Sequence, residues 1–431
     1  MNSEELGGAK FLLGTMKTKW VCANSGRGLV LLVASREREA SVLAWSVAPF
    51  LQWTAPAEGA LFVFGGRSGR LGDARQYLAS VEFLDPTVLE WRRGPDMRVA
   101  RVGLAAAYLA GGYYVIGGYN QISGEDTQRS VERLDVATMQ WGACAPLLVP
   151  RYGHSACACE GKLYVMGGDH AGALIPFAER YDPETNTWER LPDMPLRVAA
   201  SRAVAIGGKV HVFGGCDPSV PGDRASDAIL LFDPQRGVWT VMVQRMTTGR
   251  TAFALAYLPE QESVLIAGGF DLSSRPELEM HSVERIVLDR QPEEIEVPAL
   301  PALPVARAGC QGVALSELPF GSSLAMVVLG GEYVDPATGV CRVFDTASMM
   351  TSPGSRRKSS LANSLKDYSL QLVKRAMKLS TEPGWSDSIL PPMQFKRTAF
   401  AACVGSVWPQ GYPYGGTVTL SWSNWMMRRS G

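Results

Sequence analysis

Four histidines are the residues of this 431-residue chain best suited to metal binding or acid–base chemistry: His154, His170, His211 and His281. No two of them have the spacing of an HxxxH or HExxH metal motif. The chain also has no GxSxG nucleophile elbow and no phosphate-binding loop. We therefore predict a protein that is not an enzyme, with no catalytic residue, no metal site and no cofactor.

Thiol chemistry has little support either. The chain has eight cysteines and no CxxC pair, and Cys157 and Cys159 read as two small buried residues of a strand rather than as a dithiol or metal pair. No Asn-x-Ser/Thr acceptor for glycosylation occurs. These features favour a reducing compartment, and we expect a cytoplasmic protein.

Charge and hydropathy argue against two further classes of partner. Basic residues number 42 and acidic residues 42, which gives no electrostatic basis for binding nucleic acid or an anionic membrane. Apolar runs such as residues 29–34 are far shorter than the roughly 20 residues of a membrane-spanning helix. We expect no transmembrane segment.

Arginine and glycine, in contrast, recur in a pattern that must come from repeated elements. Six Gly-Gly pairs follow short apolar segments and recur every 47 to 62 residues, starting at 65, 117, 167, 214, 268 and 330. Arginine opens segments of small residues at 101, 151, 250, 307 and 397, with a shifted copy at 197. A period near 50 residues is typical of a propeller repeat.

The unit between successive glycine pairs has a constant order. After Gly-Gly comes a polar loop, then a strand that ends in an aromatic residue or leucine plus Asp, and then a turn. A tryptophan follows the turn in four units, at Trp91, Trp141, Trp188 and Trp239. A segment such as GPDMRVAR leads into the next arginine.

This unit resembles the kelch repeat, in particular that of the BTB–kelch ubiquitin-ligase adaptors. The resemblance implies a β-propeller in which each repeat forms a four-stranded blade. One blade cannot bury both faces of its sheet, whereas packing blade on blade buries them. The glycine pairs allow a sharp bend near the axis, and each tryptophan is expected to fill the space between neighbouring blades.

The strand count predicts how the ring closes. Six innermost strands match six Gly-Gly strands, but the first Gly-Gly strand has no innermost strand before it and the last innermost strand, 397–405, has no Gly-Gly strand after it. We predict an all-β, six-bladed kelch propeller over residues 58–405, in which 397–405 completes the first blade and removes two sheet edges. Residues 1–57 are predicted to be an extension or a decayed repeat, and 406–431 a tail.

Two repeats depart from the pattern. The fifth has LDRQPEEIEVPALP in place of the turn and tryptophan. The sixth has the strand CRVFD (341–345) and reaches Trp385 only after a basic insertion at 346–384, whose leucine spacing is helical. This helix is expected either to lie on its blade with the basic face in water or to dock a partner.

The resemblance implies a partner site at one mouth of the ring. Matching Arg and Tyr positions of the adaptors form a pocket for an acidic peptide, because guanidinium groups suit carboxylates. The alternative is that the arginines bind carbonyl and carboxylate groups within the ring. The predicted partner-binding residues are Arg67, Arg101, Tyr119, Arg151, Asp169, His170, Asp217, Arg250, Phe270, Asp271, Arg307, Glu332, Tyr333 and Arg397.

The leading hypothesis is a protein-interaction module that recognises substrates for a cullin-type ubiquitin ligase. Residues 1–57 do not resemble a BTB domain, so this function requires a separate BTB or cullin partner or a further N-terminal segment. One alternative is an actin-binding or cytoskeletal scaffold. Another is a propeller enzyme for a sugar or redox substrate, in which His154 and His170 would share the mouth.

Overall fold

The computed structural model describes residues 5–6, 9–10, 19–24, 29–34, 60–68, 76–85, 90–120, 127–216, 225–271, 278–288, 300–314, 324–334, 341–345, 347–351, 385–386, 393 and 401–404. The chain divides into two compact units, Met1–Ala55 and Pro56–Gly431. The first unit contains two hairpins, β1 (Glu5–Leu6) with β2 (Ala9–Lys10) and β3 (Lys19–Asn24) with β4 (Leu29–Ala34).

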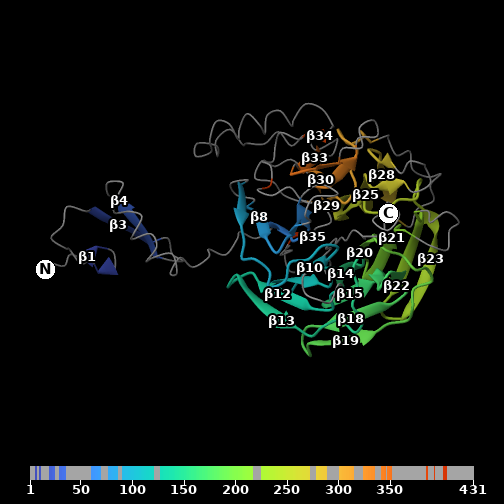
Figure 1. Ribbon diagram of the computed structural model, residues 1–431, viewed down its shortest axis with the longest axis horizontal. Coiled ribbons are helices and arrows are strands. Elements are labelled where there is room, and N and C mark those ends of the chain that lie inside the picture. The colour runs from blue at the N-terminus through green and yellow to red at the C-terminus, as the bar shows by residue number, and fades with distance from the viewer. Residues whose placement is uncertain are drawn as a thin grey trace. The chain divides into compact units, whose positions relative to one another are not determined.

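The second unit is a ring of antiparallel sheets, which confirms the prediction of an all-β propeller (Figure 1). We number the sheets I to VI in the chain order of their Gly-Gly strands. In each sheet the strands are given from the innermost to the outermost. Sheet I consists of β35 (Ala401–Val404), β5 (Leu61–Phe64), β8 (Val81–Asp85) and β9 (Glu90–Arg93), and sheet II of β10 (Ala105–Leu109), β11 (Gly112–Ile116), β12 (Val131–Asp135) and β13 (Gln140–Cys144). Sheet III consists of β14 (Ser155–Cys159), β15 (Lys162–Met166), β18 (Ala178–Asp182) and β19 (Thr187–Arg190).

The remaining sheets follow the same order, except that the described part of sheet V has three strands. Sheet IV consists of β20 (Arg202–Ile206), β21 (Lys209–Phe213), β22 (Ala228–Asp233) and β23 (Val238–Arg245). Sheet V consists of β24 (Ala254–Leu258), β25 (Ser263–Ala267) and β28 (Val283–Val287), and sheet VI of β29 (Gln311–Val313), β30 (Leu324–Leu329), β33 (Ala347–Thr351) and β34 (Trp385–Ser386). The 3-10 turn η2 (Pro259–Gln261) joins β24 to β25.

Short hairpins follow the Gly-Gly pairs, and we call them the crown hairpins. Four of them are formed by two short paired strands. In sheets II and IV a single β-bridge takes the place of the hairpin, between Tyr119 and Thr127 and between Cys216 and Ala225. The four are β6 (Arg67–Ser68) with β7 (Gln76–Tyr77), β16 (Asp169–His170) with β17 (Ala173–Leu174), β26 (Phe270–Asp271) with β27 (Leu278–Glu279), and β31 (Glu332–Val334) with β32 (Cys341–Val343).

Sheet VI corrects part of the sequence prediction. Residues 341–343, expected in the third strand of the blade, pair with β31 in a crown hairpin instead. The third strand is β33, where Met350 is buried and lies opposite Trp385. The alternation of ASMMT places Met350 in the core, so the first residues of the predicted insertion are strand. Residues 352–384, which hold the predicted helix, lie outside the described residues.

Apolar side chains fill the space between neighbouring sheets. Trp188 of sheet III belongs to the buried cluster that it shares with sheet II, and Trp141 and Trp239 pack against the clusters before their own sheets. Each indole also donates to a backbone carbonyl of the preceding repeat, Trp188 Nε1 to Ala145 O at 2.8 Å for example. The predicted wedge role of these tryptophans is confirmed.

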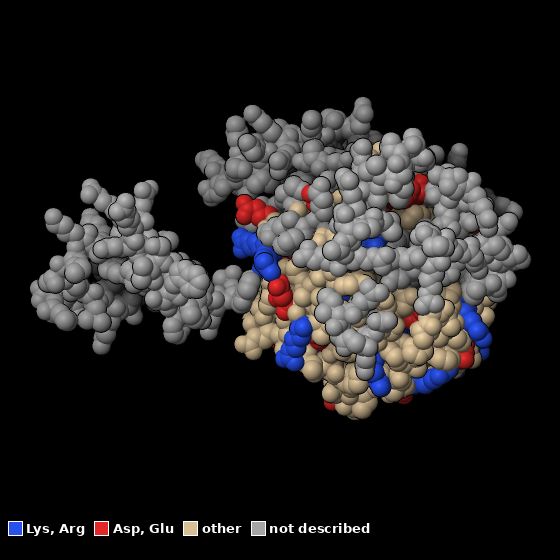
Figure 2. All heavy atoms as spheres, in the orientation of Figure 1, with Lys and Arg blue, Asp and Glu red and all other residues tan. Residues whose placement is uncertain are grey.

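The described part of the face drawn in Figure 2 has little preference for one sign of charge. On the face drawn in Figure 2, basic and acidic groups lie interspersed near the edge, and the described surface between them is mainly uncharged. In the part of the chain that the structure describes, no helix is long and apolar enough to cross a membrane.

Candidate functional site

The arginines that open the innermost strands are buried inside the ring. Arg101, Arg151, Arg250 and Arg307 each expose 1% or less of their surface. Each guanidinium donates to the carbonyl of the first glycine in the Gly-Gly pair of its own sheet, at 2.9 to 3.4 Å. These arginines therefore tie the entrance of the innermost strand to the end of the strand beside it.

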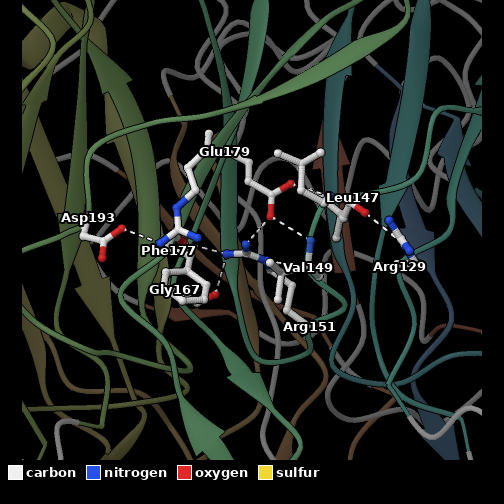
Figure 3. Close-up of polar contacts among 10 residues, drawn as sticks. Arg129, Leu147, Val149, Arg151, Gly167, Phe177, Glu179 and Asp193 are labelled. Atoms are coloured by element: carbon white, nitrogen blue, oxygen red, sulfur yellow. Dashed lines mark hydrogen bonds and ion pairs between the residues drawn. The ribbon is translucent and has the colours of Figure 1, made fainter.

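Sheet III shows the complete arrangement, which we call an arginine knot (Figure 3). Arg151 donates to Gly167 O at 3.0 Å and forms an ion pair with Glu179, and both side chains are fully buried. The Glu179 carboxylate also accepts hydrogen bonds from the backbone N–H groups of Leu148 and Val149, at 2.8 and 3.2 Å. Burial lowers the pKa of Arg151, and the charge of Glu179 opposes this shift.

Sheets II and V contain the same knot. Arg101 lies 2.6 Å from the Glu132 carboxylate, and Arg250 lies 3.6 Å from that of Glu284. Each carboxylate again accepts a hydrogen bond from a backbone N–H group, Glu132 from that of Arg98 at 2.9 Å and Glu284 from that of Thr247. Burial lowers the pKa of Arg101, and Glu132 opposes the shift.

Sheet IV replaces the charged pair by an apolar pair. Ala199 bridges Cys216 as Val102 bridges Tyr119, so Val198 takes the arginine position. Leu230 lies opposite Val212 as Glu132 lies opposite Val115 in sheet II, and it takes the glutamate position. Val198 and Leu230 belong to one buried cluster. In sheet VI, Arg307 instead lies over the ring of Phe344, 4.6 Å from its centroid.

These positions change the candidate site. A buried guanidinium engaged with carbonyls and a carboxylate does not reach a partner at the mouth, because its donors are already directed into the ring. Arg101, Arg151, Arg250 and Arg307 therefore match the alternative in which the arginines bind groups within the ring. The shifted copy at Arg197 was misaligned by one residue, since Val198 takes its place.

The crown hairpins bring their first residues together beside the axis. In sheets II to VI, this first residue pairs with the residue that follows the arginine position of its own sheet: Tyr119 with Val102, Asp169 with Tyr152, Cys216 with Ala199, Phe270 with Thr251 and Glu332 with Ala308. The residues next to these pairs join neighbouring sheets through backbone hydrogen bonds, from Gly153 N to Gly103 O, Ala200 N to Gly153 O, Ala252 N to Ala200 O and Gly309 N to Ala252 O.

The charges at this mouth are largely buried. Arg67 of sheet I forms an ion pair with Glu332 of sheet VI at 3.0 Å, and both side chains are almost fully buried. Asp169 is also buried, and its carboxylate accepts a hydrogen bond from Gly172 N at 2.8 Å. Phe270 is buried in an apolar cluster at the centre of the ring.

Tyrosines form a second feature of the mouth that the sequence reasoning only partly found. Tyr119, a predicted site residue, is half-buried, and its ring centroid lies 5.4 Å from that of Tyr152 and 6.2 Å from that of Tyr77. Tyr77 and Tyr152 were not predicted. Tyr152 directly follows Arg151, and this position is the signal that could have identified it, because it pairs with the crown residue Asp169.

The other predicted residues are distributed as follows. His170 and Tyr333 are half-buried on crown hairpins. Asp271 lies in β26, and only its backbone is described. Asp217 and Arg397 lie outside the described residues.

The histidines do not form a metal site in the described structure. Among the described residues, no group of three or more His, Cys, Asp or Glu side chains is placed to hold a metal ion. His154 is fully buried, and burial together with the charge of Arg151 lowers its pKa well below the usual range. A fully buried His154 cannot meet a substrate at the mouth beside His170.

Comparisons with known proteins agree with the repeat pattern. Residues 103–286 match the family model of the KLHDC2/KLHL20/DRC7 Kelch-repeats domain, and residues 57–98 match that of the Kelch motif. Kelch domain-containing protein 8B of Homo sapiens is 31% identical over 169 residues, which is 38% of this chain and 43% of that protein. Kelch-like protein 25 of Xenopus tropicalis is 30% identical over 197 residues, which is 46% of this chain and 25% of that protein.

These alignments cover less than half the length of the relatives. Among solved structures, that of YjhT superposes with a TM-score of 0.51 over 70% of this chain and 97% of that one, at 18% sequence identity. At this identity the likeness shows the fold alone.

Proposed function

Because this chain is a kelch-repeat protein, we propose that its propeller is a protein-interaction module and that the crown hairpins form its contact face. One observation carries the proposal: residues from separate repeats converge beside the axis, and Tyr119, His170 and Tyr333 remain partly accessible there. Loops on a rigid scaffold are where binding residues concentrate, and tyrosine supplies large contact area at low entropic cost.

The chemistry expected of the partner differs from the sequence-based hypothesis. The acidic peptide was inferred from arginines, and Arg101, Arg151, Arg250 and Arg307 are engaged inside the ring. We therefore base recognition on the partly accessible Tyr119, His170 and Tyr333, together with Asp217 and Asp271 of the same crown segments.

The finer function that we propose is substrate recognition for a cullin-type ubiquitin ligase in the cytoplasm. Its support is similarity: one relative is named Kelch-like protein 25, and another, 31% identical over 68 residues, is named Kelch repeat and BTB domain-containing protein 12. The buried free thiols of Cys157, Cys216 and Cys310 are consistent with a reducing compartment. In this proposal the protein acts without catalysis of its own.

We also infer that the ring has six blades and that the C-terminal strand completes the first. The support is that β35 pairs with β5 from Ala401 opposite Phe64 to Val404 opposite Leu61. In addition, β35 contacts both β29 and β10, the innermost strands of sheets VI and II.

Affinity purification with matched variants tests the proposed contact face. The intact chain is compared with the variants Tyr119→Ala and Tyr333→Ala and with a control, Val243→Ala, at an exposed position of the outer strand β23. Partners that the control retains and the two tyrosine variants lose support the proposal. Equal recovery by all four proteins would refute the mouth as the contact face, and absence of a cullin or BTB protein would refute the ligase step alone.

A further inference from the structure

Arg202 differs from the buried arginines Arg101, Arg151 and Arg250. It opens β20 and exposes 1% of its surface. In the described structure its guanidinium donates hydrogen bonds to backbone carbonyls: Nη1 lies 2.8 Å from Ser201 O and 3.4 Å from Ala200 O, and Nη2 lies 3.3 Å from Cys310 O. Among the described residues, no carboxylate lies within ion-pair distance of Arg202, whereas Arg101, Arg151 and Arg250 each have one.

The side chain of Arg202 lies near the axis of the ring. It starts on sheet IV, passes the ring of Phe253 on sheet V at 5.3 Å, and reaches the backbone of Cys310 on sheet VI. A side chain can join sheets IV and VI in this way only where the sheets converge. Burial lowers the pKa of Arg202, and no carboxylate opposes this shift as Glu132 does for Arg101.

The position of Arg202 is occupied by a small or neutral side chain in the other sheets. In every sheet this residue lies opposite the last residue before the Gly-Gly pair. The equivalent residues, in the order of sheets I to VI, are Ala401, Ala105, Ser155, Arg202, Ala254 and Gln311. One cation therefore lies in a layer of uncharged, almost fully buried side chains.

The guanidinium retains donors for a ligand. It carries five N–H groups, and three carbonyl oxygens are its hydrogen-bond acceptors in the described structure. Nε is buried and has no acceptor among the described residues. An arginine stays charged inside a protein, and a buried charge without a counter-charge is strongly unfavourable.

We propose that Arg202 holds a small monovalent anion, a halide or a compact oxyanion, inside the ring. The anion supplies the counter-charge and accepts from the free N–H groups. A peptide is too large for this position, because Arg202 exposes only 1% of its surface. This site is separate from the proposed contact face, so its test does not depend on the identity of a protein partner.

Thermal unfolding of the full chain tests the anion site, with sodium bromide replacing sodium gluconate at constant ionic strength. The variants are Arg202→Gln and a control, Arg245→Gln, at an exposed ion pair with Asp227. We expect the melting temperature of the intact chain and of the control to rise saturably with bromide, by about 2 °C relative to Arg202→Gln.

An equal bromide response in all three proteins, or none in the intact chain, overturns the proposal. The second result means that the chain itself supplies the counter-charge. If Arg202→Gln does not fold, crystals of the intact chain grown in bromide decide: an anomalous peak in hydrogen-bond contact with the guanidinium supports the site, and its absence refutes it.

Discussion

Arg151 and Glu179 are charged side chains that act within the fold and not on its surface. Their knot joins the carbonyl of Gly167, the backbone N–H groups before the innermost strand, and a strand two positions outward in the sheet. A buried ion pair gains little over a well-packed apolar pair, but loss of one partner leaves an uncompensated charge. Sheet IV has such an apolar pair, Val198 and Leu230, at the same two positions.

This comparison predicts a non-additive pair of substitutions. Arg151→Val alone should lower the free energy of unfolding by about 3–5 kcal/mol, because Glu179 stays buried and unpaired. Adding Glu179→Leu should recover most of that loss. Chemical denaturation of the single and double variants measures the coupling, and a double variant as unstable as the sum of the singles would contradict a pairwise role.

His154 predicts a pH dependence of stability. Its pKa is lower in the folded chain than in the unfolded chain, so the unfolded chain binds more protons as the pH falls below about 6.5. The stability is therefore fully present above that pH and decreases below it, by up to about 1.4 kcal/mol per pH unit from this group.

The substitution His154→Leu should flatten this dependence between pH 6.5 and 5, because the equivalent residue of sheet II is the buried Leu104. Denaturation midpoints measured across this range for both proteins provide the check. Unchanged slopes would show that His154 is not the titrating group.

At the scale of elements, each sheet depends on its neighbour through the outer tryptophan. Trp188 is 8% exposed and belongs to a buried cluster, whereas Trp239 is only partly buried, although both donate to a carbonyl of the preceding repeat. The pleat of the sheet places each indole over the adjacent strand. The buried area of each indole determines how much it contributes to the stability of the propeller.

Trp188→Ala should therefore destabilise the propeller by about 3–5 kcal/mol, and Trp239→Ala by less. Thermal or denaturant unfolding of the two variants compares them directly. An equal loss at both positions would mean that the hydrogen bond rather than the buried area dominates.

At the scale of the whole molecule, closure of the ring depends on residues from opposite ends of the chain. Glu82 of sheet I is fully buried at the position where glutamate pairs with arginine in sheets II, III and V. Arg397 is the arginine that the repeat places there. The pair would add a charged contact to the backbone ladder between β35 and β5.

A double-mutant cycle tests this closure. Glu82→Leu and Arg397→Val should each destabilise the chain by about 3–5 kcal/mol, and the double variant should be more stable than the sum of the two losses by about 2 kcal/mol. Additive losses would place Arg397 away from Glu82 and would count against completion of the first blade by residues 397–405.

Part of the candidate site could be predicted, because its residues follow fixed landmarks. The residues after each Gly-Gly pair, such as Tyr119, Asp169 and Glu332, converge as expected once the repeat is aligned. Burial could not be predicted in the same way. Arginine serves equally well as an exposed ligand for carboxylates and as a buried donor to carbonyls, and a sequence does not show whether Glu132 or a partner carboxylate lies next to Arg101.

The sequence by itself determined the β-propeller and the period of its repeats, since the glycine pairs, tryptophans and apolar strands are local signals that recur along the chain. Only the tertiary structure decided which charges face inward and which residues of different repeats meet. Arg67 and Glu332 lie 265 positions apart and form an ion pair because the ring brings the first and last crown hairpins together. Arg202 meets Cys310 for the same reason, because the sheets converge at the axis. The separation of two residues along the chain does not indicate which of them this convergence brings together.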